Sequence, residues 1–144
     1  MAIHRFLLVD DEPHVTHLVS YKLKQENIEV VTAQDGAEAF RLACENSPNL
    51  VITDLQMPVL SGYEMSVKLR ANRETANIPI LVLAARGHTL SDEKLAKTNI
   101  KQLMSKPFSI RELIRTAKAL VDPNQGIQPH PSATPIRDQA GRAA

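Results

Sequence analysis

Three short runs of this chain contain only apolar residues, and they restrict the possible folds more than any other feature. They lie at residues 6–9, 50–52 and 80–83. A strand that is apolar at every position needs cover on both of its faces, which is typical of a parallel sheet between two layers of helices. Longer segments with the spacing of amphipathic helices separate the runs. The sequence therefore predicts alternating strands and helices around a parallel sheet.

Two further strand candidates, 28–33 and 100–105, admit polar residues among the apolar ones. Strands at the edges of a sheet are less completely covered, so we expect these two at the edges. Asp35 and Ser109 are each followed three residues later by Glu, a pattern that marks the start of a helix. The remaining elements are predicted as strands at 3–9, 49–54 and 79–84, a helix after Pro13, and less periodic helices at 62–72 and 89–97.

The end of the chain differs in composition from the rest. The whole chain has 144 residues, enough for one domain with a substantial core. Residues 122–144 hold four of the nine prolines and few apolar side chains. Such a segment cannot bury enough surface to offset the entropy lost on ordering it. We therefore expect one domain over residues 1–121 and a flexible Pro-rich tail over 122–144.

Charge and composition bear on several classes of partner. The formal net charge is +1, and Lys and Arg are spread along the sequence without a basic cluster, so we expect no direct nucleic acid binding. The single cysteine, Cys44, cannot form an internal disulfide. No run of about 18 apolar residues is present, and the N-terminus lacks the pattern of a secretory leader. We expect a cytoplasmic protein without membrane insertion.

Charged residues follow the predicted strands where each strand ends. Asp10 and Asp11 follow the first strand, Asp54 ends the third, and Lys106 follows the fifth. Ligands of open parallel sheets bind outside the carboxyl ends of the strands. Clustered carboxylates repel one another unless a cation such as Mg²⁺ joins them, and a lysine can pair with a phosphoryl oxygen. Taken singly, the first two acids could instead stabilise the helix after Pro13, and Lys106 could be a solvated loop residue.

Three motifs resemble those of the receiver domain of two-component response regulators, of the single-domain type. They are the segment 6–12, the segment 54–58 together with Gly62, and Lys106-Pro107-Phe108. The resemblance extends from residue 3 to about residue 121. It implies a flavodoxin-like, doubly wound (βα)₅ fold whose five parallel strands have the order 2-1-3-4-5. That order places the second and fifth strands at the edges, in agreement with their polarity.

The resemblance also implies a role for each matching residue. Asp54 would accept a phosphoryl group from the phosphohistidine of a histidine kinase or phosphotransfer protein, and Lys106 would pair with the phosphoryl oxygens. Asp11, Asp54 and the backbone carbonyl of Gln56 would bind Mg²⁺ or Mn²⁺ directly. Asp10 would act mainly through a metal-bound water. The protein would signal to a downstream target by protein contacts, as a monomer or weak homodimer, and would not be a turnover enzyme.

Two positions depart from the family pattern. The family carries Thr or Ser at the end of its fourth strand and an aromatic residue three positions before the lysine, and this chain has Ala84 and Leu103 there. These are the switch positions, so an alternative is an atypical receiver that acts as a phosphorylation-independent interaction module. A phosphohydrolase with an aspartyl nucleophile is a further alternative. It usually needs an acid two residues after the nucleophile, where this chain has Gln56.

Overall fold

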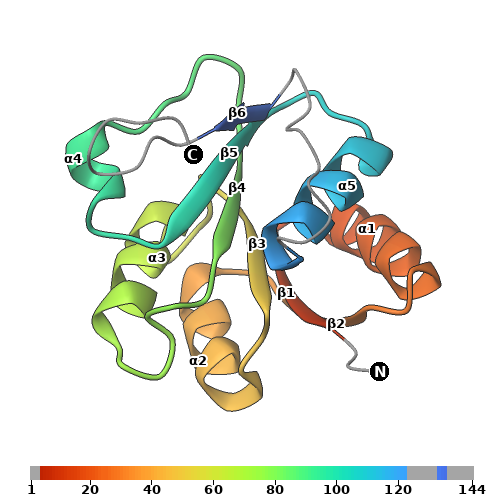
Figure 1. Ribbon diagram of the computed structural model, residues 1–144, viewed down its shortest axis with the longest axis horizontal. Coiled ribbons are helices and arrows are strands. Elements are labelled where there is room, and N and C mark those ends of the chain that lie inside the picture. Colours follow the sequence, from red (N-terminus) through yellow and green to blue (C-terminus); the bar gives the residue numbers. More distant parts are fainter. Residues whose placement is uncertain (1–3, 123–132, 136–144) are drawn as a thin grey trace.

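A parallel sheet forms the centre of the computed structural model, which describes residues 4–122 and 133–135. The five parallel strands lie in the order β2-β1-β3-β4-β5, so the predicted fold class and strand order are confirmed. The three fully apolar runs form the central strands β1, β3 and β4 (Figure 1). The strand bounds are β1 Arg5–Val9, β2 Glu29–Ala33, β3 Leu50–Asp54, β4 Ile80–Ala84 and β5 Ile100–Ser105.

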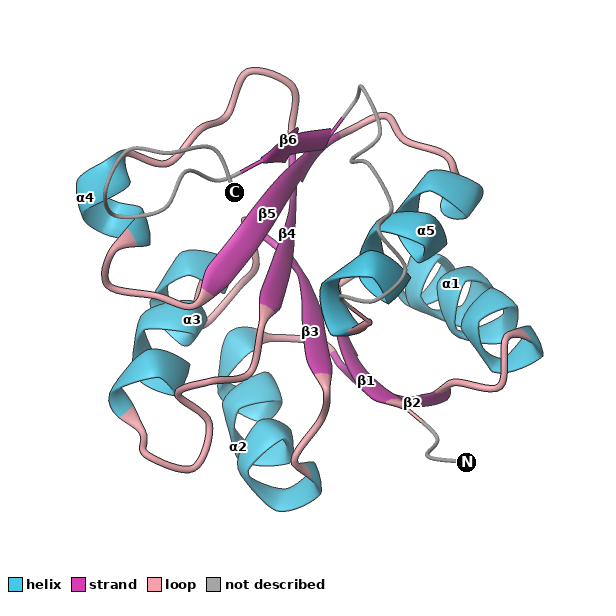
Figure 2. Ribbon diagram, viewed as in Figure 1, coloured by secondary structure: helices cyan, strands magenta, loops and turns pink. Residues whose placement is uncertain are grey.

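Helices cover both faces of the sheet. Helices α1 and α5 lie side by side on one face, and α2, α3 and α4 lie on the other (Figure 2). The helix predicted at 89–97 is a single turn, α4, because its apolar residues show too little helical periodicity to bury a longer face. The helix bounds are α1 Pro13–Gln25, α2 Gly36–Asn46, α3 Gly62–Ala71, α4 Asp92–Leu95 and α5 Ile110–Val121.

Two hydrophobic cores lie on opposite faces of the sheet. Successive side chains of a strand point to opposite faces, so Phe6 and Leu8 enter the core under α1 and α5. Leu7 and Val9 enter the core under α2 and α3. All four of these side chains are at most 1% exposed. Covering both faces is the physical reason why the central strands are apolar at every position.

Side-chain caps begin four of the helices that leave the carboxyl edge of the sheet, α2 to α5, whereas α1 begins at Pro13 without one. Oδ1 of Asp35 accepts a hydrogen bond from the backbone N–H of Glu38, at 2.8 Å, as the sequence predicts. A complete reciprocal capping box, which the sequence analysis missed, joins Ser61 and Glu64 at the start of α3. The Ser-x-x-Glu signal for it is present in the sequence. It fixes the entry into α3 directly after the loop that follows Asp54.

A sixth strand, β6 (Ala133–Pro135), pairs antiparallel with β5. It corrects the expectation that β5 lies at the edge of the sheet, whereas β2 does lie at an edge. Composition argues only about burial of side chains, but an edge strand also offers unpaired backbone groups that an extended segment can use. The rest of the predicted tail, 123–132 and 136–144, lies outside the described residues.

None of the helices within residues 4–122 and 133–135 has the length and apolar character needed to cross a bilayer.

Candidate metal and phosphoryl site

The predicted acids meet at the carboxyl edge of the sheet. Asp10 directly follows β1, and Asp54 is the last residue of β3. One carboxylate oxygen from each of Asp10, Asp11 and Asp54 lies within 4.8 Å of the others. This separation is short enough for one small cation to contact more than one of the three acids. The local rule that places a loop after each parallel strand thus brings together residues more than 40 positions apart in the sequence.

Asp10 is the most deeply buried acid of the cluster, with an exposed fraction of 2%. Its Oδ1 accepts a hydrogen bond from the backbone N–H of Glu12 at 2.9 Å. Burial raises the pKa of Asp10 above its usual value, and the negative charge of Asp54 raises it further. The hydrogen bond from Glu12 and the charge of Lys106 oppose that rise without cancelling it. The site therefore holds a carboxylate whose ionised form gains from a cation.

Asp54 and Lys106 form an ion pair across the site. The Nζ of Lys106 lies 3.3 Å from Oδ1 of Asp54, and the same oxygen accepts a hydrogen bond from the backbone N–H of Leu55 at 2.9 Å. The Asp54 side chain is 12% exposed and that of Lys106 is 37% exposed. Both contacts use Oδ1, whereas Oδ2 accepts no hydrogen bond from the described residues. The peptide bond between Lys106 and Pro107 is cis.

Gly62 lets α3 approach the end of β3. A Cβ atom at this position would lie 2.2 Å from the carbonyl oxygen of Asp54, closer than real side chains come to a backbone atom. The N–H of Gly62 also donates a hydrogen bond to the carbonyl of Leu55 at 2.8 Å. Only glycine fits this approach, which explains its place in the motif. Gln56, the predicted carbonyl ligand, lies exposed at the start of the loop between β3 and α3.

The two positions predicted to form the switch, Ala84 and Leu103, lie in β4 and β5. Ala84 is 1% exposed, and its carbonyl accepts a hydrogen bond from the N–H of Lys106 at 2.8 Å. Leu103 is half-buried against the core under α2 and α3, the core that also contains Ala84. The residue paired with Ala84 across β4 and β5 is Ser105, which the sequence analysis did not single out. Ser105 therefore brings a hydroxyl to the strand pair in which Ala84 lacks one.

Comparison with known proteins places this geometry in a family. Residues 6–118 match the family model described as the response regulator receiver domain. The chain is 32% identical over 135 residues to the transcriptional regulatory protein SrrA of Staphylococcus aureus. That match covers 94% of this chain and 55% of SrrA, so the chain spans about half the length of this relative.

Solved structures of receivers superpose closely on the chain. The chemotaxis response regulator CheY4 of Vibrio cholerae gives a TM-score of 0.75 at 28% identity, over 83% of this chain and 99% of CheY4. The receiver domain of the sensor histidine kinase PA1611 of Pseudomonas aeruginosa gives 0.73 at 27% identity, over 83% of this chain and 98% of that domain. The PA1611 structure has a magnesium ion coordinated in its active site cleft.

Proposed function

The chain belongs to the response regulator receiver domain family, and we propose that it accepts a phosphoryl group on Asp54 in a Mg²⁺-dependent reaction. Receiver domains are signalling domains that interact with histidine kinases and downstream effectors. We propose a histidine kinase or phosphotransfer protein as the donor for this chain and a protein as its downstream target. One observation carries the proposal: three carboxylates and a lysine converge where β1, β3 and β5 end.

The donor set fits a hard divalent cation. Mg²⁺ and Mn²⁺ prefer oxygen ligands, and Mg²⁺ is typically held by one or two carboxylates together with water and phosphate oxygens. Asp11 and Asp54 are the residues that would hold the ion, with the backbone carbonyl of Gln56, and Asp10 would act through a bound water. The raised pKa of Asp10 supports this assignment, because burial and the charge of Asp54 disfavour its ionised form more than Glu12 and Lys106 favour it. A magnesium ion in the related PA1611 receiver supports it further.

The chemistry assigned to Asp54 is nucleophilic. Its Oδ2 forms a new O–P bond while the N–P bond of the donor phosphohistidine breaks, and the imidazole leaves with the electron pair of that bond. Lys106, already 3.3 Å from Oδ1, holds a phosphoryl oxygen by charge. The bound cation supplies neutralisation of the negative charge shared by the phosphoryl group and the acids. Positioning and charge, rather than proton transfer, account for the reaction.

Intact mass spectrometry tests the proposal. The protein is incubated with Mg²⁺ and acetyl phosphate, a small phosphodonor that needs no kinase. We expect a gain of one phosphoryl group that disappears when Mg²⁺ is chelated. A protein that stays unmodified under conditions in which a known receiver is labelled would overturn the assignment.

A second candidate function is favoured by the switch positions. Ala84 has no hydroxyl to bond a phosphoryl oxygen, and Leu103 has no polar tip. A receiver with these residues could bind its target without depending on phosphorylation. The two functions differ in one measurable respect: only the first predicts that affinity for the target changes when Asp54 is phosphorylated.

A further inference from the structure

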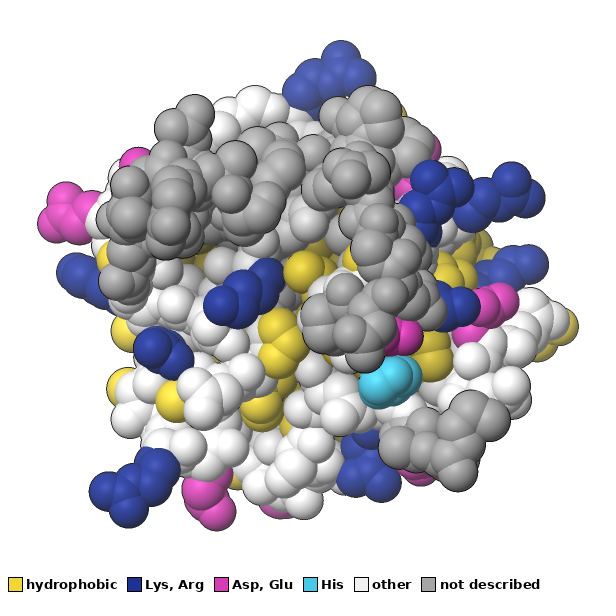
Figure 3. All heavy atoms as spheres, viewed as in Figure 1, with side chains coloured by type: hydrophobic (Ala, Val, Ile, Leu, Met, Phe, Trp, Pro, Cys, Tyr) yellow, Lys and Arg dark blue, Asp and Glu magenta, His cyan; other side chains and the backbone are white. Residues whose placement is uncertain are grey.

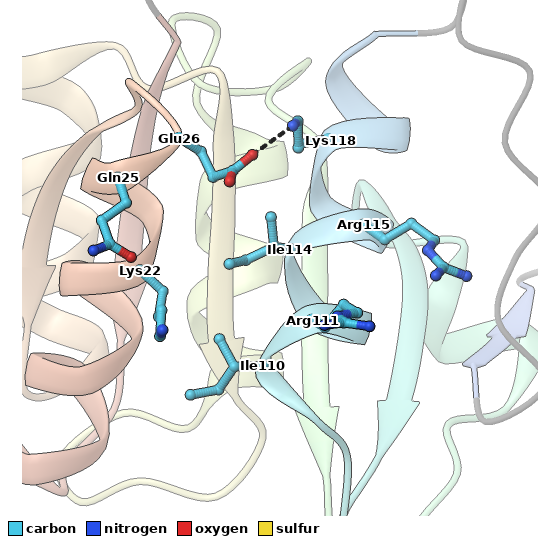
Figure 4. A pocket seen from close by; sticks show the side chains of 8 residues that line it. All are labelled: Lys22, Gln25, Glu26, Ile110, Arg111, Ile114, Arg115 and Lys118. Atoms are coloured by element: carbon cyan, nitrogen blue, oxygen red, sulfur yellow. Dashed lines mark hydrogen bonds and ion pairs between the residues drawn. The ribbon is translucent and has the colours of Figure 1, made fainter.

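A groove between α1 and α5 lies outside the acid cluster. It has a volume of about 520 Å³. Figure 4 shows Ile110 and Ile114 projecting from α5 toward α1, while Lys22 and Gln25 line the α1 side. Both isoleucines are half-buried and pack against the core under these two helices. The floor of the groove is therefore apolar and fixed by the core.

An ion pair closes one end of the groove. Nζ of Lys118 lies 2.7 Å from Oε1 of Glu26, and the dashed line in Figure 4 marks this contact between α5 and α1. The hydrogen bond and the charge of Lys118 lower the pKa of Glu26 below its usual value. Glu26 is thus fully ionised at neutral pH, and its charge is matched by Lys118. The pair holds the two walls together without using the other cations.

The remaining charges of the groove are positive. Arg111 and Arg115 lie one helical turn apart on the outer rim of α5, and Lys22 lies on α1 (Figure 4). In the part of the chain that the structure describes, none of these three forms an ion pair. Figure 3 shows several Lys and Arg side chains on the side of the molecule formed by α1 and α5, with Asp and Glu side chains between them and further Lys and Arg side chains elsewhere on the same face.

Charge is concentrated in this groove relative to the rest of the protein. Among the described residues that line it, four cations and one carboxylate give a net charge of +3. The whole chain carries +1, so the residues outside the groove carry −2. The sequence shows no basic cluster because the groove joins two distant segments: Lys118 and Glu26 are 92 positions apart. The electrostatic field of this charge distribution steers an anionic partner toward the groove and away from the negatively charged residues outside it.

We propose that the α1–α5 groove binds an acidic, amphipathic segment of a partner protein. Carboxylates of the segment pair with Lys22, Arg111 and Arg115, and its apolar side chains cover Ile110 and Ile114. The apolar floor favours such a segment over a small inorganic anion, which would leave the isoleucines uncovered. None of the described residues that line the groove is aromatic, so they offer no stacking platform of the kind that single-stranded nucleic acids use. The proposal does not depend on phosphorylation of Asp54.

The test uses the full-length, unphosphorylated protein without Mg²⁺. The probe is a fluorescent peptide of about 18 residues, made of Glu, Leu and Ala and long enough to form a helix. We expect Arg111→Glu/Arg115→Glu to weaken binding at least about tenfold, since two attractions become repulsions, and we expect added salt to weaken binding by the wild type. The matched control is Arg73→Glu/Lys97→Glu, which makes the same charge change at exposed positions outside the groove and should leave affinity unchanged.

Several outcomes would overturn the proposal. Equal losses in the two double variants would mean that only net charge matters. A polyglutamate peptide without leucine that binds as tightly as the amphipathic probe would remove the role of the apolar floor. Tighter binding of a single-stranded DNA oligonucleotide, lost in the groove variant alone, would assign the groove to nucleic acid. Because Arg111 and Arg115 are exposed, circular dichroism melting should show that the groove variant folds.

Discussion

The carboxyl edge of the sheet has two halves that differ in the chemistry they carry. The ends of β1 and β3 bring together Asp10, Asp11 and Asp54, with Lys106 reaching across to Asp54. In the other half, Ala84 ends β4 and Leu103 lies within β5, and neither side chain has a hydroxyl or a polar ring. If Asp54 accepts a phosphoryl group, as we propose, the chain has the acids and the lysine for that step but lacks the hydroxyl and the aromatic ring expected at the two predicted switch positions. On this proposal, the ability to accept the group and the ability to respond to it depend on different residues of one fold.

The largest expected effect concerns the accepting half. Replacing Asp54 with Asn should abolish phosphoryl labelling by acetyl phosphate, because an amide oxygen is too weak a nucleophile. Intact mass spectrometry measures the gain. The matched control is Asp92→Asn in α4, which removes one exposed acid outside the cluster and should leave labelling unchanged. Undiminished labelling of the Asp54 variant would place the nucleophile elsewhere.

The next effect concerns the responding half. A hydrogen bond to a charged group is worth roughly 1.5–3 kcal/mol, and a switch shifts only as far as its ligand favours one state. We therefore expect a beryllofluoride mimic of the phosphoryl group to change NMR shifts mainly around Asp54 and Ala84, with weak changes over residues 90–121. Ala84→Thr combined with Leu103→Tyr should extend the changes into 90–121.

The two single variants serve as controls for the double variant. Each should restore little alone, and the excess of the double variant over their sum measures their coupling. Ser105, paired with Ala84 across the strands, already offers one hydroxyl. If the wild type shows large changes throughout 90–121, the responding half is not weakened and the comparison between the two halves fails.

A smaller effect concerns stability and pH. In the folded protein the pKa of Asp10 is raised, so the folded state holds its proton more tightly than the unfolded state. As pH rises from 3.8, the usual pKa of an Asp side chain, through the raised pKa, the contribution of Asp10 to the free energy of unfolding decreases. Without Mg²⁺, Asp10→Asn should therefore raise the melting temperature at pH 7. This advantage over the wild type should vanish below pH 3.8.

Mg²⁺ should reverse this difference, so that the wild type melts at a higher temperature than Asp10→Asn. At 100 times its Kd, an ion that binds only the folded state stabilises it by about 2.7 kcal/mol. Asp10→Asn should retain less of that gain, because the substitution removes one of the charges that the ion compensates. Differential scanning calorimetry with and without Mg²⁺ measures the effect of the substitution and the effect of the ion on the melting temperature. If neither the substitution nor the ion changes the melting temperature, the acids do not act as one site.

The smallest effect concerns the tail. Deleting residues 123–144 removes β6, which pairs with β5 over only three residues, and Pro135 has no N–H to donate. We expect the free energy of unfolding to change by less than about 1 kcal/mol. Hydrogen exchange should nevertheless accelerate for the β5 amides that face β6. Unfolding of the truncated domain would show that the tail belongs to its core.

The fold and the accepting half of the site could be predicted because their signals are local. Apolar runs such as 6–9 indicate a strand that is covered on both faces, and acids at strand ends indicate the edge of the sheet where ligands bind. The capping box of Ser61 and Glu64 is also a local sequence signal, but it was not predicted. The short helix α4 was overestimated because a weak periodicity does not define where a helix ends.

Local sequence patterns predicted the alternation of strands and helices. The family motifs predicted the strand order, and the acids and lysine at the strand ends predicted that Asp10, Asp54 and Lys106 lie close together. Long-range packing alone decided the rest. A register irregularity pairs Ile80 with Ile100 but Leu81 with Gln102, and it places Leu103 in the same core as Ala84. Backbone pairing added β6 to β5, and the packing of α5 on α1 gathered the cations of the groove. Contacts between distant segments depend on register and packing angle, which no short stretch of sequence encodes.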